Sequence, residues 1–236
     1  MSILRKFVRR RWVDTPLDRL RFTLDTLQPA MDYQPLPWLG LRKAGRAMGV
    51  ASRWDAILAC IERLRIQSAV DVGANAGFFT IALAQRGVNV MAIENDPRFH
   101  RVCLYAIRRL SLDNVGLLFG TVKPSNVQMV PTADCMLFLA VWHHMVRDYG
   151  YDAATQILEA LWCKTRQVMF FETGESEMPK YYNLPDMTPD PATYLREYLS
   201  SVCNDGNVVH LGPHETVFPD PSKSWKRNLF AILRSS

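Results

Sequence analysis

The sequence lacks long hydrophobic runs, internal repeats and low-complexity segments. Its longest uninterrupted apolar run covers residues 136–142, far short of the ~20 residues that a membrane-spanning helix needs. No apolar region of a secretory signal follows the basic N-terminus, because arginines interrupt every candidate, so a secretory signal is not expected. With 48% hydrophobic and 22% charged residues, the composition is typical of a folded globular protein and excludes a disordered or fibrous chain.

Cysteine is scarce, and its spacing carries no motif. The five cysteines are Cys60, Cys103, Cys135, Cys163 and Cys203. They form no C-x-x-C pair, and their odd number argues against a disulfide framework. An H-E-x-x-H motif is also missing from the sequence, so a zinc site of that type is excluded. We therefore expect no metal and a reducing, cytoplasmic environment.

The net positive charge comes from one end of the chain. Residues 1–22 carry seven basic and two acidic side chains, whereas the other 214 residues carry 21 of each. The formal net charge of +5 is therefore a property of an N-terminal arm. The rest of the protein lacks the basic surface that is typical of nucleic-acid-binding domains.

The arm also has a pattern of its own. Its apolar residues, which share one helical face, are Ile3, Leu4, Phe7, Val8 and Trp12. A basic helix with such a face can lie in the interface of an anionic membrane. We predict peripheral attachment of residues 1–22 to the inner face of a membrane, and the alternative is that these apolar residues pack on the protein's own core.

Two parts are expected along the chain. Residues 1–50 are predicted to form the basic helical arm and a wrapping segment rich in proline and glycine, and residues 51–236 a single domain. Ser52 is expected to cap a helix whose apolar positions recur at helical spacing through Leu64. Downstream, strands are predicted at 68–72, 88–94, 115–119, 134–141, 167–172, 208–211 and 228–233, and helices at 77–85, from 97, at 152–164 and at 188–202. This alternation predicts an α/β fold with a doubly wound, seven-stranded, mostly parallel sheet, to which the last strands add one antiparallel neighbour.

The most informative motif follows the first predicted strand. Asp71, Gly73 and Gly77 form a D-x-G-x-x-x-G loop that leads into a helix, and Glu94 ends the next strand. Ligands of open α/β sheets bind at such strand ends, and a terminal acid there can accept hydrogen bonds from both hydroxyls of a ribose. The loop differs from the dinucleotide fingerprint G-x-G-x-x-G, because a carboxylate at position 71 would repel a pyrophosphate.

This loop resembles motif I of the class I S-adenosylmethionine-dependent methyltransferases, a Rossmann-like family. Asn75, in place of the usual middle glycine, resembles the FkbM-type O-methyltransferases in particular. The resemblance implies that S-adenosylmethionine is the cofactor, with its methionine ammonium near Asp71 and its ribose on Glu94. The implied cofactor site comprises Asp71, Gly73, Ala74, Asn75, Gly77, Phe78, Glu94, Thr121 and Ala140. The alternatives are another nucleotide cofactor and a glycine-rich turn without a ligand.

Candidate catalytic residues follow the fourth and fifth predicted strands. His143 and His144 stand at the expected end of the fourth strand, and Glu172 ends the fifth. A neutral imidazole can take a proton from an acceptor hydroxyl near neutral pH, and we predict that His143 does so. In the alternative, one or both histidines pack under the next helix. Glu172 is expected to orient the acceptor or the cofactor, and Glu175 and Glu177 are expected to form a solvated acidic turn.

The C-terminal half resembles a narrower group. Its aromatic-His-His strand end, glutamate-rich fifth strand end, aromatic loop and basic last hairpin resemble the methyltransferase domain of the O-antigen chain-terminating methyltransferase/kinases, which implies a sugar phosphate acceptor. The predicted acceptor-binding residues are Lys180, Tyr181, Lys226 and Arg227. A weaker similarity exists to the wobble-uridine tRNA carboxymethyl transferases.

The predicted function is therefore methyl transfer from S-adenosylmethionine to an oxygen of a sugar or sugar phosphate, on a lipid-linked acceptor of surface glycan biosynthesis. Two alternatives are an RNA methyltransferase, whose arginine arm would bind the phosphate backbone, and a catalytically silent binding module with the same fold.

Overall fold

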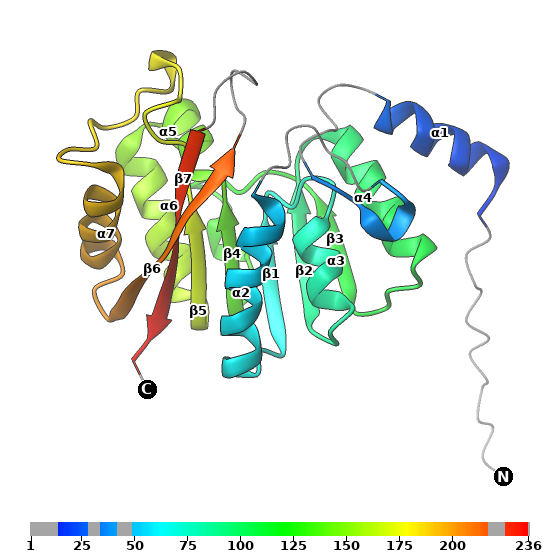
Figure 1. Cartoon of the computed structure of the whole chain (residues 1–236), viewed down its shortest axis with the longest axis horizontal. Helices are drawn as coiled ribbons and strands as arrows, with labels where there is room; N and C mark the ends of the chain where they lie inside the picture. Colours follow the sequence, from blue (N-terminus) through cyan, green and yellow to red (C-terminus); the bar gives the residue numbers. More distant parts are fainter. Residues whose placement is uncertain (1–13, 28–33, 42–48, 217–224, 236) are drawn as a thin grey trace, which may run out of the picture.

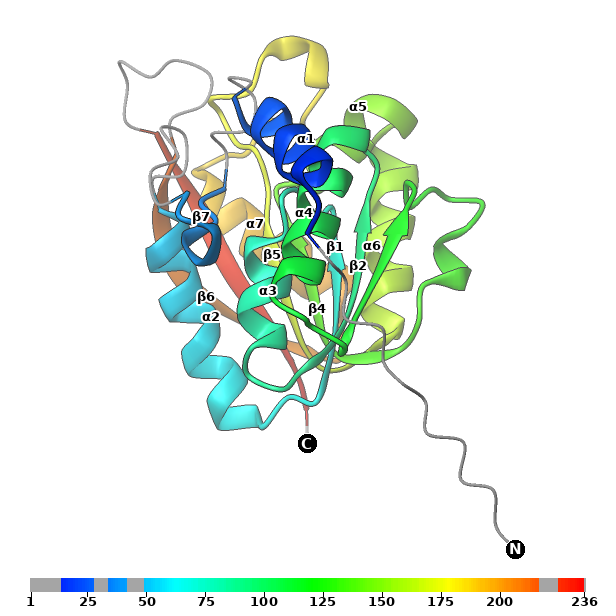
Figure 2. The ribbon, with the colours of Figure 1, turned by 90° about the vertical axis from the view of Figure 1, so that its right-hand side faces the viewer.

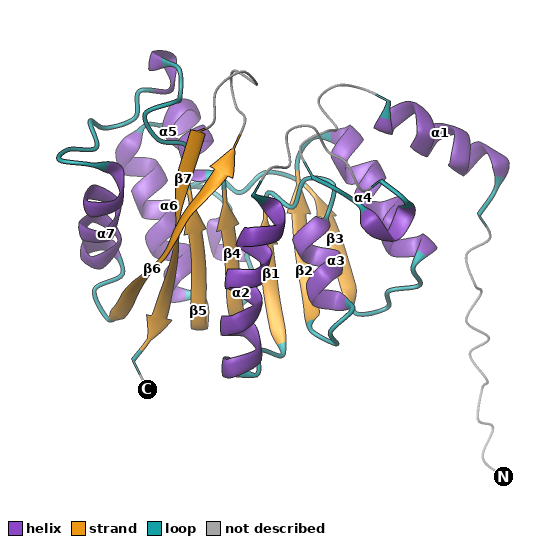
Figure 3. Ribbon diagram, in the orientation of Figure 1, coloured by secondary structure: helices purple, strands orange, loops and turns teal. Residues whose placement is uncertain are grey.

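The protein is built around one seven-stranded sheet with helices on both faces (Figures 1 and 3). The computed structural model describes residues 14–27, 34–41, 49–216 and 225–235. The strands are β1 (Ser68–Val72), β2 (Asn89–Glu94), β3 (Val115–Phe119), β4 (Ala133–Leu139), β5 (Thr165–Glu172), β6 (Gly206–Thr216) and β7 (Trp225–Arg234). Their order is β3-β2-β1-β4-β5-β7-β6. The first five are parallel, and β7 runs antiparallel to both β5 and β6, which confirms the predicted fold class.

The helices divide between the two faces of the sheet. Two of them, α2 (Val50–Leu64) and α3 (Phe78–Ala84), lie on one face, whereas α5 (Trp142–Tyr149), α6 (Tyr151–Cys163) and α7 (Pro191–Val202) lie on the other (Figure 1). Strand β4 shows why both faces must be covered. Met136 and Phe138 pack toward α5 and α6, whereas Leu137 packs toward α2 and α3. A strand that is buried on both faces is apolar throughout, which explains the long apolar run there.

N-terminal residues complete one side of the domain. Helix α1 (Pro16–Thr26) lies on α4 (Pro97–Arg109) (Figure 2). Leu36, just before the short helix η2 (Pro37–Leu39), is 1% exposed in a small apolar cluster with Ile81 and Val102. The five apolar residues of the predicted membrane-binding face lie outside the described residues. No helix within the described part of the chain is long and apolar enough to cross a membrane.

Several predicted boundaries were wrong, and three of them have a visible structural cause. Strand β4 ends at Leu139, because Ala140 adopts a positive φ of 56° that turns the chain, and α5 then begins at Trp142. The α2 helix begins two residues before Ser52, whose hydroxyl binds His214 across the fold instead of capping the helix. The predicted helix at 188–202 begins at Pro191 instead, because the Asp190 side chain caps it by accepting from the Thr193 N–H.

The loop after β1 allows a test of the packing around its last glycine. Gly77 has φ +91°, and a Cβ built there would lie 2.5 Å from Cys103 Sγ. We expect Gly77→Ala to lower the free energy of unfolding by about 1–2 kcal/mol through backbone strain and by about 1–3 kcal/mol more through overpacking. Gly87→Ala is the matched control, because Gly87 has φ +84° with no heavy atom within 4 Å of its built Cβ. Equal losses in urea unfolding would contradict the packing argument.

Candidate active site

A cavity of about 500 Å³ opens at the carboxyl ends of β1, β2 and β4. One part of its wall comes from the loop after β1 and the end of β2, including Gly73, Asn75 and Glu94. The other part comes from α5 and from the segment after β5, including His143, His144 and Tyr182. The cavity therefore joins the predicted cofactor and acceptor sides in one space.

The loop after β1 is tightly packed and has backbone angles that few residues adopt. Gly73 and Asn75 have positive φ angles of 76° and 55°, which glycine adopts freely and asparagine tolerates better than most residues. A Cβ at Gly73 would lie 2.5 Å from Val141 Cγ2, so any side chain at position 73 would collide with the opposite wall. The N–H groups of Gly73 and Ala74 donate to the carbonyl oxygen of Ile93 at 2.9 and 3.0 Å, which fixes the loop on β2.

Glu94 is the best placed of the predicted cofactor ligands. It is 4% exposed and lines the cavity. Its Oε2 accepts a hydrogen bond from the Asn75 N–H at 2.7 Å, and its Oε1 accepts one from the Asp96 N–H at 2.6 Å. Burial raises the pKa of this carboxyl, although these backbone donors oppose the shift. Each oxygen keeps a second acceptor position, so the carboxylate can still bind a pair of hydroxyl groups.

Asp71 has a different place from the one predicted. It does not line the cavity; it is buried, and its Oδ2 accepts a 2.6 Å hydrogen bond from Thr80 Oγ1. Burial raises its pKa to about 6. Asp71 therefore ties the end of β1 to α3, and no contact of its side chain with a ligand in the cavity is indicated.

The other predicted cofactor residues divide in the same way. Thr121 and Ala140 line the cavity together with Gly73, Asn75 and Glu94. The residues that stay outside its wall are Ala74, Gly77 and Phe78. Phe78 packs on Trp38 and Trp54 instead. These three residues belong to the loop and the start of α3 but do not face the cavity.

The two histidines lie in the first turn of α5, not on an extended strand end. Their ring centroids are 4.3 Å apart, and both rings are near Tyr182. Both residues line the cavity, but their surroundings differ. His143 is 3% exposed, whereas His144 is half-buried.

His143 is held as a hydrogen-bond donor. Its Nδ1 accepts a 2.8 Å hydrogen bond from the Gly174 N–H and lies 3.3 Å from Thr173 Oγ1. Because a backbone N–H can only donate, the neutral ring carries its proton on Nε2. Burial lowers the pKa of His143 well below its usual range, and Arg227 adds to the shift. Neither nitrogen is then free to take a proton, so the predicted role of His143 as general base is not supported by the geometry.

His144 fits that role better. Within the described residues its ring nitrogens take part in no hydrogen bond. Burial lowers its pKa to about 4, with Arg147 contributing, so the ring is neutral near pH 7. A neutral imidazole with an unengaged nitrogen, on the wall of a cavity, is able to accept a proton, and its lowered pKa makes it a weaker base than an ordinary histidine.

Glu172 acts on the cavity through Arg53. Glu172 is 1% exposed and is not in the cavity wall, whereas Arg53 is 5% exposed and lines it. The Arg53 Nη1 atom donates to both carboxylate oxygens, at 2.9 and 3.0 Å. Breaking such a buried pair from one side costs about 3–5 kcal/mol. Glu172 is therefore a positioning residue for an arginine that the sequence analysis missed.

A second buried ion pair fixes the segment after β5. Arg227 Nε donates to Glu177 Oε1 at 2.6 Å, with side chains 4% and 1% exposed. Glu175 Oε1 accepts from the Asn228 side-chain amide at 3.0 Å, and burial raises the pKa of Glu175 to about 7. The prediction of a solvated acidic turn was therefore wrong, since both carboxylates bind β7 and hold Met178 at the cavity wall.

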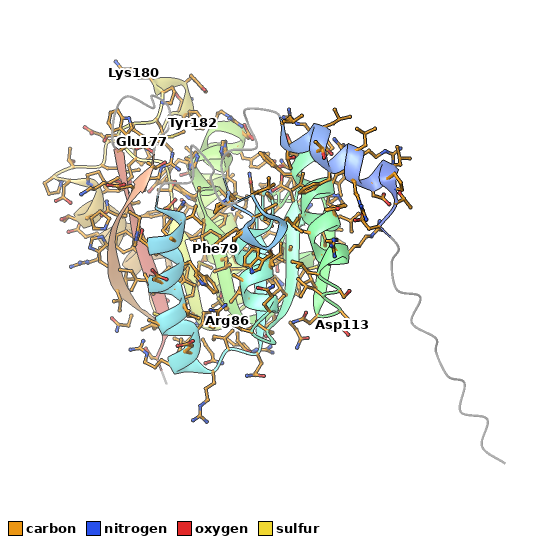
Figure 4. The ribbon with its side chains drawn as sticks, turned by 45° about the vertical axis from the view of Figure 1, so that its right-hand side comes forward. Phe79, Arg86, Asp113, Glu177, Lys180 and Tyr182 are labelled. Atoms are coloured by element: carbon orange, nitrogen blue, oxygen red, sulfur yellow. The ribbon has the colours of Figure 1, made fainter. Side chains whose placement is uncertain are left out.

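Of the four predicted acceptor-binding residues, Arg227 alone lies in the wall of the described cavity. Lys180, Tyr181 and Lys226 are exposed and lie outside it. Figure 4 shows Lys180 pointing away from the protein, whereas Glu177 and Tyr182 lie closer to its body. In the short helix η4 (Lys180–Tyr182), successive side chains point in different directions. Tyr182 is buried at the cavity, and the side chains of Lys180 and Tyr181 therefore point elsewhere.

Several wall residues were absent from the predicted site: Gln34, Arg53, Phe99, Arg147, Met178 and Tyr182. One of them left a signal in the sequence. Arg53 lies four residues before Ile57, on the apolar face of its helix, and a charge there needs a buried partner. The others come from segments whose approach to the cavity depends on tertiary packing. Among the described residues, no cluster of three or more potential metal ligands occurs.

The chain has the class I methyltransferase fold, as predicted. Among solved structures, it is similar to magnesium protoporphyrin IX methyltransferase (ChlM) from Synechocystis PCC 6803 with bound SAM. The TM-score is 0.56 at 15% identity, and the match covers 79% of this chain and 80% of that one. No protein-family model matches the chain.

The chain is also similar in sequence to a particular methyltransferase/kinase. Over 151 residues the chain is 26% identical to the O-antigen chain terminator bifunctional methyltransferase/kinase WbdD of Escherichia coli, which covers 61% of this chain and 20% of WbdD. A WbdD crystal structure matches with a TM-score of 0.65 at 22% identity, over 84% of this chain and 41% of that one. The chain thus spans about a fifth of the length of this curated relative. The predicted resemblance is confirmed.

The lowered pKa of His143 predicts how the stability of the protein depends on pH. The folded protein keeps this histidine neutral, whereas the unfolded chain protonates it below about pH 6.5. Stability from this residue is thus present above that pH and is lost as the pH falls. Between pH 7.5 and 5, the stability advantage of wild type over His143→Asn should shrink by about 2 kcal/mol in urea unfolding.

His143→Asn keeps an acceptor for the Gly174 N–H, and His143→Gln is its companion variant. Both lack the titrating ring, so both should show the same pH-dependent change whatever their packing cost. Asp71 and Glu175, whose raised pKa values act in the opposite sense, are present in all three proteins and cancel. A wild-type advantage that stays constant with pH would show that His143 titrates normally in the folded state.

Proposed function

We propose that the chain binds S-adenosylmethionine in the cavity and transfers a methyl group to an oxygen of a sugar or sugar phosphate. The observation that carries this proposal is the single cavity that joins a closely packed glycine loop and Glu94 to His144 and buried arginines. The similarity to WbdD supports the glycan acceptor, and the similarity to ChlM with bound SAM supports the cofactor.

The residues present fit this cofactor. Glu94 would bind the ribose hydroxyls, because it is a carboxylate at the end of β2 with free acceptor positions. Gly73 would place loop backbone at the cavity wall, and its missing Cβ lets the loop pack closely against Val141. Phe79 and Phe99 add apolar surface to the same wall. When bound, S-adenosylmethionine supplies a methyl group that its sulfonium makes electrophilic.

A sugar hydroxyl and a phosphate oxygen would require different residues on the acceptor side. A sugar hydroxyl must lose a proton, which His144 would accept. A phosphate monoester is already ionised near pH 7 and needs donors instead, which Arg53, Arg147 and Arg227 would supply. The three arginines are paired with Glu172, Asp148 and Glu177. Because these pairs balance the arginine charges, we favour the hydroxyl as the methylated group.

Cofactor binding is tested by replacing Glu94. Calorimetry should detect S-adenosylmethionine binding to wild type, and Glu94→Gln should weaken it by about 1–3 kcal/mol, because an amide cannot accept from a diol as a carboxylate does. Glu62→Gln, on the exposed side of α2, is the control and should bind like wild type. Binding of NAD in place of S-adenosylmethionine would refute the proposal.

The acceptor chemistry is tested by comparing the two histidines. With methyl-labelled cofactor and a panel of sugars and sugar phosphates, His144→Ala should lower turnover about 10²–10⁴-fold without changing cofactor affinity. His143→Asn should be much milder, since His143 is not free to take a proton. If His144→Ala is mild and Arg147→Ala or Arg227→Ala is severe, the methylated oxygen belongs to a phosphate.

A further inference from the structure

Helix α1 presents an unusual apolar surface to solvent. Leu17, Leu20, Leu24 and Leu27 are 53%, 55%, 56% and 73% exposed. Their spacing of three, four and three residues places them in one stripe along the helix, here called the leucine stripe. Single exposed leucines are normal, but a contiguous row of four marks an interaction surface.

The opposite face of α1 is fixed to the domain. Phe22 stacks on Tyr105 of α4 with ring centroids 4.3 Å apart. Asp25 accepts two hydrogen bonds from Arg101, at 2.6 and 2.9 Å. Asp14, just before α1, accepts a hydrogen bond from the Tyr105 hydroxyl at 3.3 Å and pairs with Arg109 at 3.8 Å. With one face packed on α4 (Figure 2), α1 leaves the leucine stripe exposed to solvent.

The charges around the stripe favour one kind of partner. Residues 14–27 and 96–109 together carry six arginines and four aspartates, a net excess of two positive charges, and three of the aspartates pair with four of the arginines. The thirteen residues that precede Asp14 in the sequence add five basic side chains and no acidic one. Apolar surface flanked by an excess of arginine is typical of helices that lie on anionic lipid, with the apolar side buried and the cations near headgroups.

The position of α1 relative to the cavity gives the surface a use. Asp96 and Phe99 of α4 line the cavity, and Arg101 on the same helix holds α1. In Figure 1, α1 lies at the end of the sheet where the parallel strands terminate. A flat surface that contacts the leucine stripe would therefore run close to the side of the domain on which the cavity opens.

We propose that the leucine stripe of α1 docks the protein on an anionic membrane surface and places the cavity beside lipid-linked acceptors. The docking itself is independent of the proposed function, and only its use for acceptor delivery rests on that function. The physical basis is burial of four half-exposed leucines together with attraction between arginines and anionic headgroups.

Liposome flotation of the full chain tests the docking. Wild type should float with vesicles of phosphatidylglycerol and phosphatidylcholine but not with phosphatidylcholine alone. Raising salt from ~0.1 M to ~1 M should release it, because the Debye length falls from ~10 Å to ~3 Å. The variant Leu17→Gln/Leu20→Gln/Leu24→Gln should partition about tenfold or more weakly.

The matched control is Leu118→Gln/Met129→Gln, which removes two apolar side chains that are 54% and 84% exposed but lie outside α1. It should float like wild type. Flotation of the triple variant equal to wild type would overturn the proposal. So would a wild-type dimer in light scattering that the triple variant dissociates, or binding of wild type to single-stranded RNA without binding to vesicles.

The same proteins should be measured for S-adenosylmethionine binding by calorimetry. The triple variant should bind the cofactor like wild type, which shows that it is folded and that the cavity is intact. Loss of flotation with cofactor binding retained supports the docking proposal. Flotation without any cofactor binding in wild type would refute the proposed function alone.

Discussion

The two hydrogen bonds that Glu94 accepts are the constraint on which the site depends. Through Asn75 N–H and Asp96 N–H, one buried carboxylate joins the loop after β1, the end of β2 and the cap of α4. An unmatched carboxylate in such a place would be costly, so the strand, the loop and the helix have to come together around it. The same contacts keep the carboxylate at the cavity wall, where a ligand with paired hydroxyls can reach it.

The acceptor side is organised by a different principle. Arg53 and Arg227 reach the cavity from opposite sides, one from α2 and the other from β7, and each is held by a buried glutamate from β5 or the segment that follows it. Buried pairs of this kind contribute little net stability but are expensive to break. Their effect here is geometrical, because they fix guanidinium groups whose side chains would otherwise be flexible. Both guanidinium groups are thus held in place at the cavity wall with their charges balanced.

The histidine pair shows how one backbone donor separates two adjacent residues of the same type. The Gly174 N–H fixes the proton of His143 on Nε2, whereas His144 keeps its lone pair. Both rings are neutral near pH 7, since burial opposes their protonation. One ring can therefore donate a hydrogen bond and its neighbour can accept a proton.

The sequence by itself determined the fold class, because alternating apolar strands and amphipathic helices have few ways to bury both faces of a sheet. It also determined that Gly73, Asn75 and Glu94 would line one cavity, since they lie at the ends of strands that are side by side. Only the tertiary structure decided which side chains enter the cavity. The Asp71 side chain binds Thr80 and does not line the cavity. Lys180 and Lys226 are exposed to solvent. Arg53 lines the cavity from α2, a helix that carries none of the predicted motifs. Those outcomes depend on contacts between segments as far apart as the 119 residues between Arg53 and Glu172. Local sequence patterns do not show which distant segments contact each other, so these side-chain positions could not be predicted from them.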